Sequence, residues 1–129
     1  AGRPYSSPLY DHRAPLEQQA SALSLLTERH VAVRADSGEV CFARPTRDDQ
    51  RVIRPALTRV PAPSLTLKQA LQTSGVHSGT LAATLALGMP PERGILFANC
   101  AAALATPTSL SARDAIEAAA DELLARDLA

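Results

Sequence analysis

Large aromatic side chains are scarce in this sequence: it has no tryptophan, and aromatic residues make up 3% of its 129 residues. Hydrophobic residues still account for 46% of the chain, and alanine and leucine dominate them. A core of this kind is built from small side chains, so its helices can approach each other closely. Cysteine is also rare. Cys41 and Cys100 lie far apart in apolar surroundings, which favours two buried thiols and leaves a disulfide as the alternative.

An excess of charge of either sign is absent, because 13 basic residues balance 13 acidic ones. A net charge of zero predicts no long-range attraction to nucleic acid or to an anionic membrane. No apolar run approaches the roughly 20 residues of a membrane span, and no signal-peptide pattern is visible. We therefore expect a cytoplasmic protein without nucleic-acid or membrane partners.

Metal-binding patterns are missing as well. The three histidines, His12, His30 and His77, lie in separate segments, and neither paired-cysteine spacing nor an HExxH motif occurs. The sequence therefore predicts no metal site and no metal-ligating residue.

The length and pattern of the chain predict a single α/β domain over residues 15–129, preceded by an extended arm at 1–14. The arm carries Tyr5 and Tyr10 and has no periodic pattern. It is either a loosely held terminus or a segment that docks its tyrosines on a surface.

A small β-sheet is predicted within about residues 31–60. Apolar residues alternate on both sides of an Asp-Ser-Gly turn at 36–38, which indicates a β-hairpin. Residues 44–51 are predicted to be a charged loop. A further strand is expected over 52–60, at an edge or with a bulge, because Pro55 has no N–H for a central ladder.

Helical spacing of apolar residues predicts five helices packed with this sheet. They are expected over about residues 15–29, 67–72, 78–87, 92–105 and from 112 onward, with Thr66 and Ser111 as amino-terminal caps. The helix over 92–105 is apolar on nearly every side, so it should be buried. Asn99 is the lone polar residue at its centre. A buried amide needs partners, and these are either a neighbouring loop or a ligand.

The stretch Thr-Ser-Gly-Val-His-Ser-Gly-Thr at residues 73–80 leads into the helix expected at 78–87. Exposed backbone N–H groups at a helix start, next to small residues, form a favourable anion site. The alternative is a helix start that is merely rich in capping residues. The candidate anion- or nucleotide-binding residues are Ser74, Gly75, His77, Ser78, Gly79, Thr80 and, near the ligand, Asn99.

The order of these pieces resembles the carboxyl-terminal part of the PfkB or ribokinase family of carbohydrate kinases. The matching pieces are Val-Pro-Ala-Pro at 60–63, His-Ser-Gly at 77–79, Leu-Ala-Leu-Gly at 85–88, the Ala-Asn pair at 98–99 and Pro-Thr at 107–108. The resemblance covers about half of the chain. It implies a ribokinase-like carboxyl-terminal half, with ATP and Mg²⁺ as ligands.

The motif that carries the family's chemistry is not intact here. In the family, a Gly-Ala-Gly-Asp turn supplies the catalytic aspartate and the anion hole. In this chain the aspartate position is occupied by Gly75. Glycine cannot act as a general base, so the sequence predicts no catalytic residue. If the chain were active, it would be an ATP-dependent sugar kinase.

Two functions of different classes follow from these patterns. The first is a kinase-like, nucleotide-binding half domain without its base, which is a truncated or degenerate relative or a fragment. The second is a non-catalytic protein-interaction or assembly domain, which associates with itself or with a partner chain.

Overall fold

The computed structural model describes residues 13–105 and 113–127. Of the predicted arm at 1–14, only residues 13 and 14 lie within these ranges, so Tyr5 and Tyr10 lie outside them. The predicted loop at 106–110 and the Ser111 cap also lie outside the described residues. The elements in chain order are α1 (Leu16–Thr27), β1 (Val31–Arg34), β2 (Val40–Arg47), β3 (Ile53–Val60), α2 (Leu67–Gln72), α3 (Ser74–Ala86), α4 (Pro91–Leu104) and α5 (Arg113–Asp127). The predicted mixture of helices with a small sheet is confirmed.

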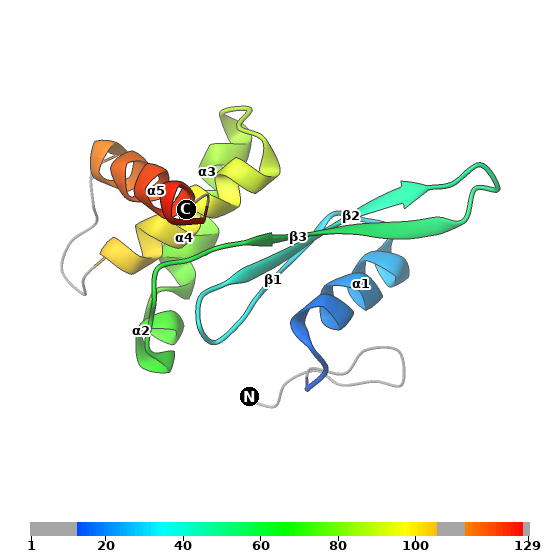
Figure 1. The fold of residues 1–129 in the computed structure, drawn as a ribbon, viewed down its shortest axis with the longest axis horizontal. Helices are drawn as coiled ribbons and strands as arrows, with labels where there is room; N and C mark the ends of the chain where they lie inside the picture. The colour runs from blue at the N-terminus through cyan, green and yellow to red at the C-terminus, as the bar shows by residue number, and fades with distance from the viewer. Residues whose placement is uncertain (1–12, 106–112, 128–129) are drawn as a thin grey trace. The chain divides into compact units, whose positions relative to one another are not determined.

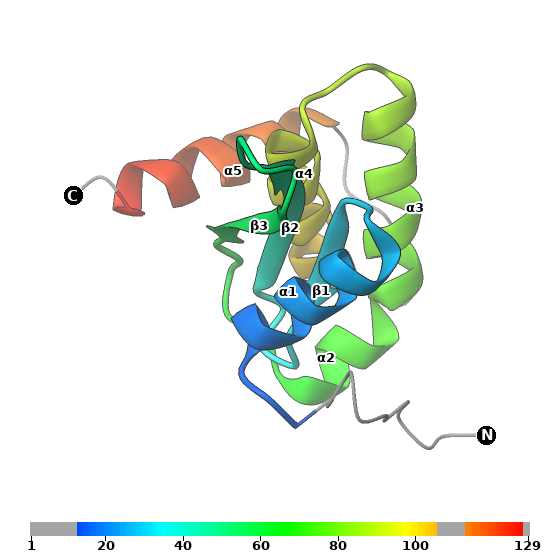
Figure 2. The same ribbon diagram turned by 90° about the vertical axis from the view of Figure 1, so that its right-hand side faces the viewer.

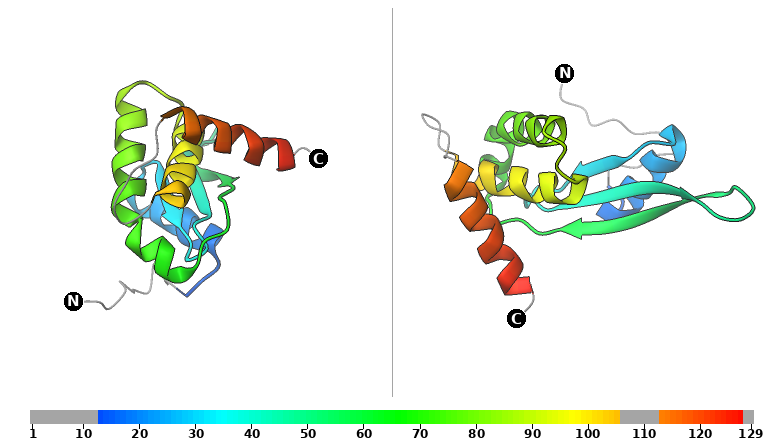
Figure 3. Two further views of the ribbon diagram at one scale, coloured as in Figure 1. Left: turned by 90° about the vertical axis from the view of Figure 1, so that its left-hand side faces the viewer. Right: turned by 90° about the horizontal axis from the view of Figure 1, so that it is seen from above.

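The chain divides into two compact units. Residues 1–34 and 41–59 form the first unit, which holds α1 and most of the sheet, whereas 35–40 and 60–129 form the second. The second unit holds α2 to α5, with α4 beside both α3 and α5 (Figures 1, 2 and 3).

In the first unit, α1 packs on one face of a three-stranded antiparallel sheet of order β1-β2-β3. The centre of this core is built from Ala20 of α1 and from Cys41 and Ala43 of β2, all fully buried. Leu16, Val31 and Val33 surround them. Because the central side chains are small, the helix can lie close to the strands.

The strand β3 lies at an edge of the sheet, as Pro55 predicts. The turn between β1 and β2 also agrees with the sequence pattern, since Gly38 has a φ of 91°, a conformation that glycine adopts readily. The charged loop expected over residues 44–51 is wrong in its first half, because β2 continues to Arg47. Cross-strand pairing with β3 favours the extended backbone there despite the polar composition.

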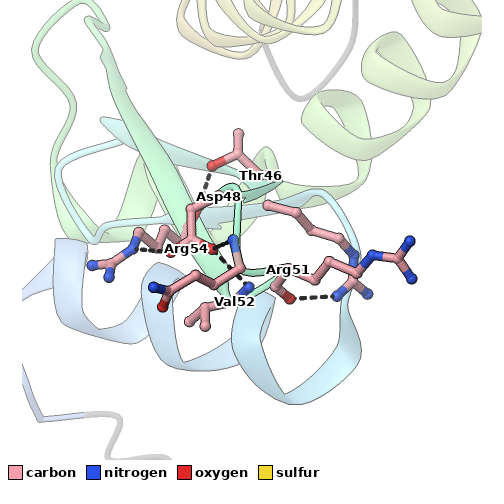
Figure 4. Close-up of polar contacts among 7 residues, drawn as sticks. Thr46, Asp48, Arg51, Val52 and Arg54 are labelled. Atoms are coloured by element: carbon pink, nitrogen blue, oxygen red, sulfur yellow. Dashed lines mark hydrogen bonds and ion pairs between the residues drawn. The ribbon is translucent and has the colours of Figure 1, made fainter.

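The turn between β2 and β3 is organised around Asp48 (Figure 4). Its carboxylate accepts hydrogen bonds from the N–H groups of Gln50 and Val52, each at 2.9 Å. It also forms an ion pair with Arg54 at 3.1 Å. These donors favour the charged carboxylate and hold the pKa of Asp48 below its usual range, with the Val52 N–H as the largest cause.

This lowered pKa predicts an acid-sensitive hairpin. A carboxyl whose pKa is lower in the folded state stabilises the fold above its unfolded pKa. That contribution is lost as the pH falls through the folded value. In urea titrations, we expect Asp48→Asn to have a lower free energy of unfolding at pH 7 than the unmodified chain. Between pH 7 and pH 3, the free energy of unfolding should fall less in Asp48→Asn than in the unmodified chain. Asp49→Asn is the matched control. An unchanged acid dependence in Asp48→Asn would contradict this role.

In the second unit, Thr66 caps α2 as predicted. Its hydroxyl accepts from the N–H of Gln69 at 3.1 Å, and the Gln69 side chain accepts from the Thr66 N–H at 2.9 Å. The bounds predicted for this helix, 67–72, are confirmed, whereas the start expected for the next helix at about residue 78 is wrong, because α3 begins at Ser74. Only Thr73 separates the two helices, and its carbonyl accepts the first bond of α3, from the His77 N–H at 2.9 Å.

The helix α4 is the core of this unit. It is buried continuously over residues 94–102, as its all-round apolar pattern predicts. It packs against α3 on one side and α5 on another (Figure 2). Gly94 lies close against α3, since an added Cβ there would lie 2.6 Å from the Thr84 hydroxyl oxygen.

Gly94 therefore tests how tightly α3 and α4 pack. Overpacking typically costs about 1 to 3 kcal/mol, so Gly94→Ala should lower the free energy of unfolding in a urea titration. The matched control is Gly79→Ala on α3, where an added Cβ meets no atom within 4 Å. There the helix propensity of alanine should raise stability by about 0.5 to 1 kcal/mol. If both substitutions were stabilising, the close approach would be disproved.

Candidate functional site: a pocket on helices α3, α4 and α5

A pocket of about 590 Å³ lies within the second unit, on helices α3, α4 and α5. Its size falls in the range of small-molecule sites, roughly 300 to 1,000 Å³. The lining residues are Gly75, Val76, Gly79, Thr80, Ala83, Thr84, Leu87, Met89, Phe97, Arg113 and Ile116. The pocket is thus mainly apolar, and Arg113 is the one charged residue among its described lining residues.

The wall contributed by α3 is open because of its glycines. Gly75 and Gly79 are one helical turn apart, so both face the pocket. A Cβ at either position would meet no protein atom within 4 Å. Side chains at these positions would occupy the pocket itself, and their absence leaves the helix backbone accessible to a flat ligand.

The side chains that line the pocket come from all three helices. Phe97 of α4 and Ile116 of α5 are 6% and 7% exposed, so each presents only a small part of its side chain to the pocket. Thr84 donates its hydroxyl hydrogen to the carbonyl of Leu81 at 2.9 Å. The guanidinium of Arg113 pairs with Glu117 at 3.0 Å on the exposed face of α5. An exposed pair of this kind is worth at most about 1 kcal/mol, so an anion can replace the carboxylate.

The predicted site residues separate into three groups. Gly75, Gly79 and Thr80 line the pocket. Ser74 and Ser78 are exposed on α3 and do not line it, and the Ser74 hydroxyl donates to the carbonyl of Leu71 at 3.2 Å. The remaining two, His77 and Asn99, form a buried pair.

The helix start on which the anion site over residues 73–80 was predicted lies earlier than expected. Because α3 begins at Ser74, Ser78, Gly79 and Thr80 lie inside the helix. Their N–H groups bond to carbonyls four residues earlier and cannot be offered to an anion. An anion at this pocket would depend on Arg113, which the sequence pattern did not indicate.

Asn99 has all of its polar groups satisfied within the protein. Its amide nitrogen donates to the carbonyl oxygen of Pro61 at 2.9 Å and, more weakly, to that of Val60 at 3.4 Å. Its amide oxygen lies 2.7 Å from Nε2 of His77 and accepts a hydrogen bond from it. Of the two alternatives drawn from the sequence, the structure shows the hydrogen bond to a neighbouring loop.

The two cysteines are buried thiols that form no disulfide, as the sequence favours. Burial raises the pKa of Cys100 to about 11, partly offset by the charge of Arg93. A thiol with that pKa is almost entirely protonated at neutral pH, so it is a poor nucleophile. No cluster of three metal-ligating side chains occurs among residues 13–105 and 113–127.

Met89, Phe97, Arg113 and Ile116 are pocket residues that the sequence did not identify. They lie 10 to 40 residues from the Gly-Val-His-Ser-Gly segment, and nothing in their local pattern distinguishes them from core or surface positions. Only the packing of α4 and α5 brings them beside α3.

Comparison with protein-family models, with curated proteins and with solved structures finds no match for this chain. None of the helices that the structure describes is long and apolar enough to cross a membrane.

The buried pair gives a test of how the second unit is held together. Asn99→Ala removes the hydrogen-bond partner of Nε2 of His77 and of the carbonyl oxygen of Pro61. Leaving a buried polar group without a partner lowers stability by about 1 to 3 kcal/mol per group. We expect Asn99→Ala and His77→Ala each to lower the free energy of unfolding by this amount or more. The double variant should be less destabilised than the sum, with a coupling of about 1 kcal/mol in urea titrations. Simple additivity of the two losses would contradict a direct bond.

Proposed function

We propose that this chain is a nucleotide-binding half domain of the carbohydrate-kinase (PfkB or ribokinase) kind, without the family's catalytic base. The observation that carries the proposal is the composition of the pocket. Three residues from the segment predicted as an anion site, Gly75, Gly79 and Thr80, line a mainly apolar pocket of nucleotide-compatible size.

In this proposal the base of ATP or ADP lies against the glycine wall of α3 and the apolar side chains of α4 and α5. Flat aromatic rings suit such a surface, because the missing side chains at Gly75 and Gly79 allow close contact. Arg113 then pairs with a phosphate group. Mg²⁺ would be carried by the nucleotide phosphates, since no protein cluster for it occurs in the described residues.

Phosphoryl transfer is not part of the proposal. A kinase needs a group that accepts the proton of the attacking hydroxyl, and the family's aspartate position is Gly75. The chain would therefore bind nucleotide as a structural or regulatory ligand, in the cytoplasm where ATP is abundant. A partner chain or a second copy would have to supply any missing catalytic half.

A second candidate is a non-catalytic interaction or assembly domain. Large apolar side chains are exposed on the second unit, notably Leu71 of α2 at 67% and Leu87 after α3 at 75%. Leu87 also lines the pocket. The pocket would then receive an apolar side chain of a partner instead of a nucleotide base.

Thermal unfolding with and without millimolar Mg-ATP tests the first function. A ligand that binds only the folded state stabilises it, by about 2.7 kcal/mol at 100 times its Kd. We expect a clear rise in Tm with ATP or ADP. Gly79→Leu should abolish that rise because the new side chain fills the pocket, without loss of stability in the absence of nucleotide.

Ser78→Leu is the matched control, since it places the same side chain one residue away on an exposed part of α3 that does not line the pocket. It should retain the full rise. No effect of nucleotide on the unmodified chain would reject the proposal. Concentration-dependent association in sedimentation, weakened by Leu87→Ser and indifferent to nucleotide, would favour the interaction domain.

A further inference from the structure

The neutral net charge of the chain conceals an uneven distribution. The first unit, residues 1–34 and 41–59, contains nine arginines and five acidic residues. The second unit contains four basic and eight acidic residues. One unit is therefore basic and the other acidic by equal amounts. Charge asymmetry of this kind is a better guide to polyanion binding than the average over the chain.

The arginines of the basic unit concentrate on the β2–β3 hairpin. Its outer end extends beyond α1 (Figures 1 and 3). Four arginines lie between residues 44 and 54 and all are exposed: Arg44, Arg47, Arg51 and Arg54. The side chains of Arg47 and Arg54 are 56% and 73% exposed.

Between residues 44 and 54 the four arginines outnumber two acidic residues, Asp48 and Asp49, so this segment keeps a net positive charge. Arg44 lies over the ring of Phe42, 5.8 Å from its centroid, an arrangement that keeps the cation exposed. Arg47 pairs with Glu28 at 3.3 Å and donates to the carbonyl of Arg51 at 3.1 Å. Exposed ion pairs contribute little, at most about 1 kcal/mol, so a phosphate can displace their carboxylates.

Asp48 has a different role from these arginines. It is only 28% exposed, and its oxygens are already occupied by two backbone N–H groups and Arg54 (Figure 4). The acidic group thus closes the turn while the guanidinium groups remain on the surface. A two-stranded ribbon with exposed cations results.

We propose that the β2–β3 hairpin is a binding site for double-helical DNA, contacted through its phosphate groups. A two-stranded β-ribbon fits the major groove of B-form DNA, and arginine pairs with phosphate oxygens through two parallel hydrogen bonds. The site lies in the first unit and is independent of the pocket proposed to bind nucleotide.

Single-stranded nucleic acid is a poorer match for this surface. Proteins that bind single strands stack the bases on exposed aromatic side chains. The one phenylalanine, tyrosine or tryptophan in the described part of the first unit is Phe42, which is buried, at 4% exposure, and stacked against His30 with ring centroids 5.8 Å apart. An acidic protein would need no stacking surface, so the experiment must distinguish duplex DNA from an acidic polypeptide as the ligand of the hairpin.

The experiment is an anisotropy titration of a fluorescein-labelled 20-base-pair duplex with the full chain at 50 and 200 mM NaCl. For an assumed three phosphate contacts, a plot of the logarithm of the association constant against the logarithm of the salt concentration has a slope of about −2.7. The Kd should therefore rise about 40-fold between the two salt concentrations. Arg47→Gln combined with Arg51→Gln removes two contacts, so it should weaken binding at 50 mM NaCl and reduce the salt effect to about fourfold.

The matched control combines Arg93→Gln with Arg126→Gln, which makes the same change in net charge within the acidic unit. It should leave both affinity and salt dependence unchanged. The salt titration of the unmodified chain remains decisive even if a variant fails to fold. The absence of duplex binding at 50 mM NaCl would overturn the proposal. So would an equal loss in the control, or tighter binding of a single-stranded 20-mer or of polyglutamate than of the duplex.

Discussion

The second unit depends on a single buried amide. Asn99 is the one polar side chain in the continuously buried part of α4, and it joins three segments that are distant in sequence. Its amide nitrogen donates to the carbonyls that follow β3, and its oxygen accepts from His77 of α3. Because an unpaired amide at this depth is costly, other arrangements of α3, α4 and this linker are penalised. Apolar alanine surfaces have little directional preference of their own, so the amide supplies the specificity that their packing lacks.

Small side chains explain both the packing of this unit and its pocket. Gly94 lets α4 approach α3 so closely that the Thr84 hydroxyl oxygen lies 2.6 Å from the position that a Cβ would take. On another part of α3, Gly75 and Gly79 have no neighbour to fill the space beside them. The same scarcity of large residues thus produces close contact at one position and a pocket at another. A nucleotide base is one ligand whose shape suits this pocket.

The units also differ in charge, which separates two modes of recognition in one chain. The acidic helical unit has a mainly apolar pocket with one arginine among its described lining residues, which suits a small, partly apolar ligand. The basic unit presents arginines on a hairpin closed by Asp48, which suits an extended polyanion. Exposed charges at separate sites act almost independently at physiological salt, because screening limits their reach to about 8 Å. The nucleotide and DNA proposals can therefore stand or fall separately.

Local patterns in the sequence were enough to predict the hairpin turn at Gly38, the edge or bulged position of β3, Thr66 as the cap of α2 and the burial of α4. Each depends on neighbours within a few residues or on helical periodicity. The start of α3 and the outer half of β2 could not be predicted in this way. Glycine and hydroxyl residues at 74–80 have weak helix preference, and packing on α4 overrides it. Cross-strand pairing likewise extends β2 through polar residues.

The pocket was decided by tertiary structure alone, since Phe97, Arg113 and Ile116 join Gly75 and Gly79 only when the helices pack. The partners of Asn99 were decided in the same way: burial in an apolar helix required them, but only the fold could supply His77 and Pro61.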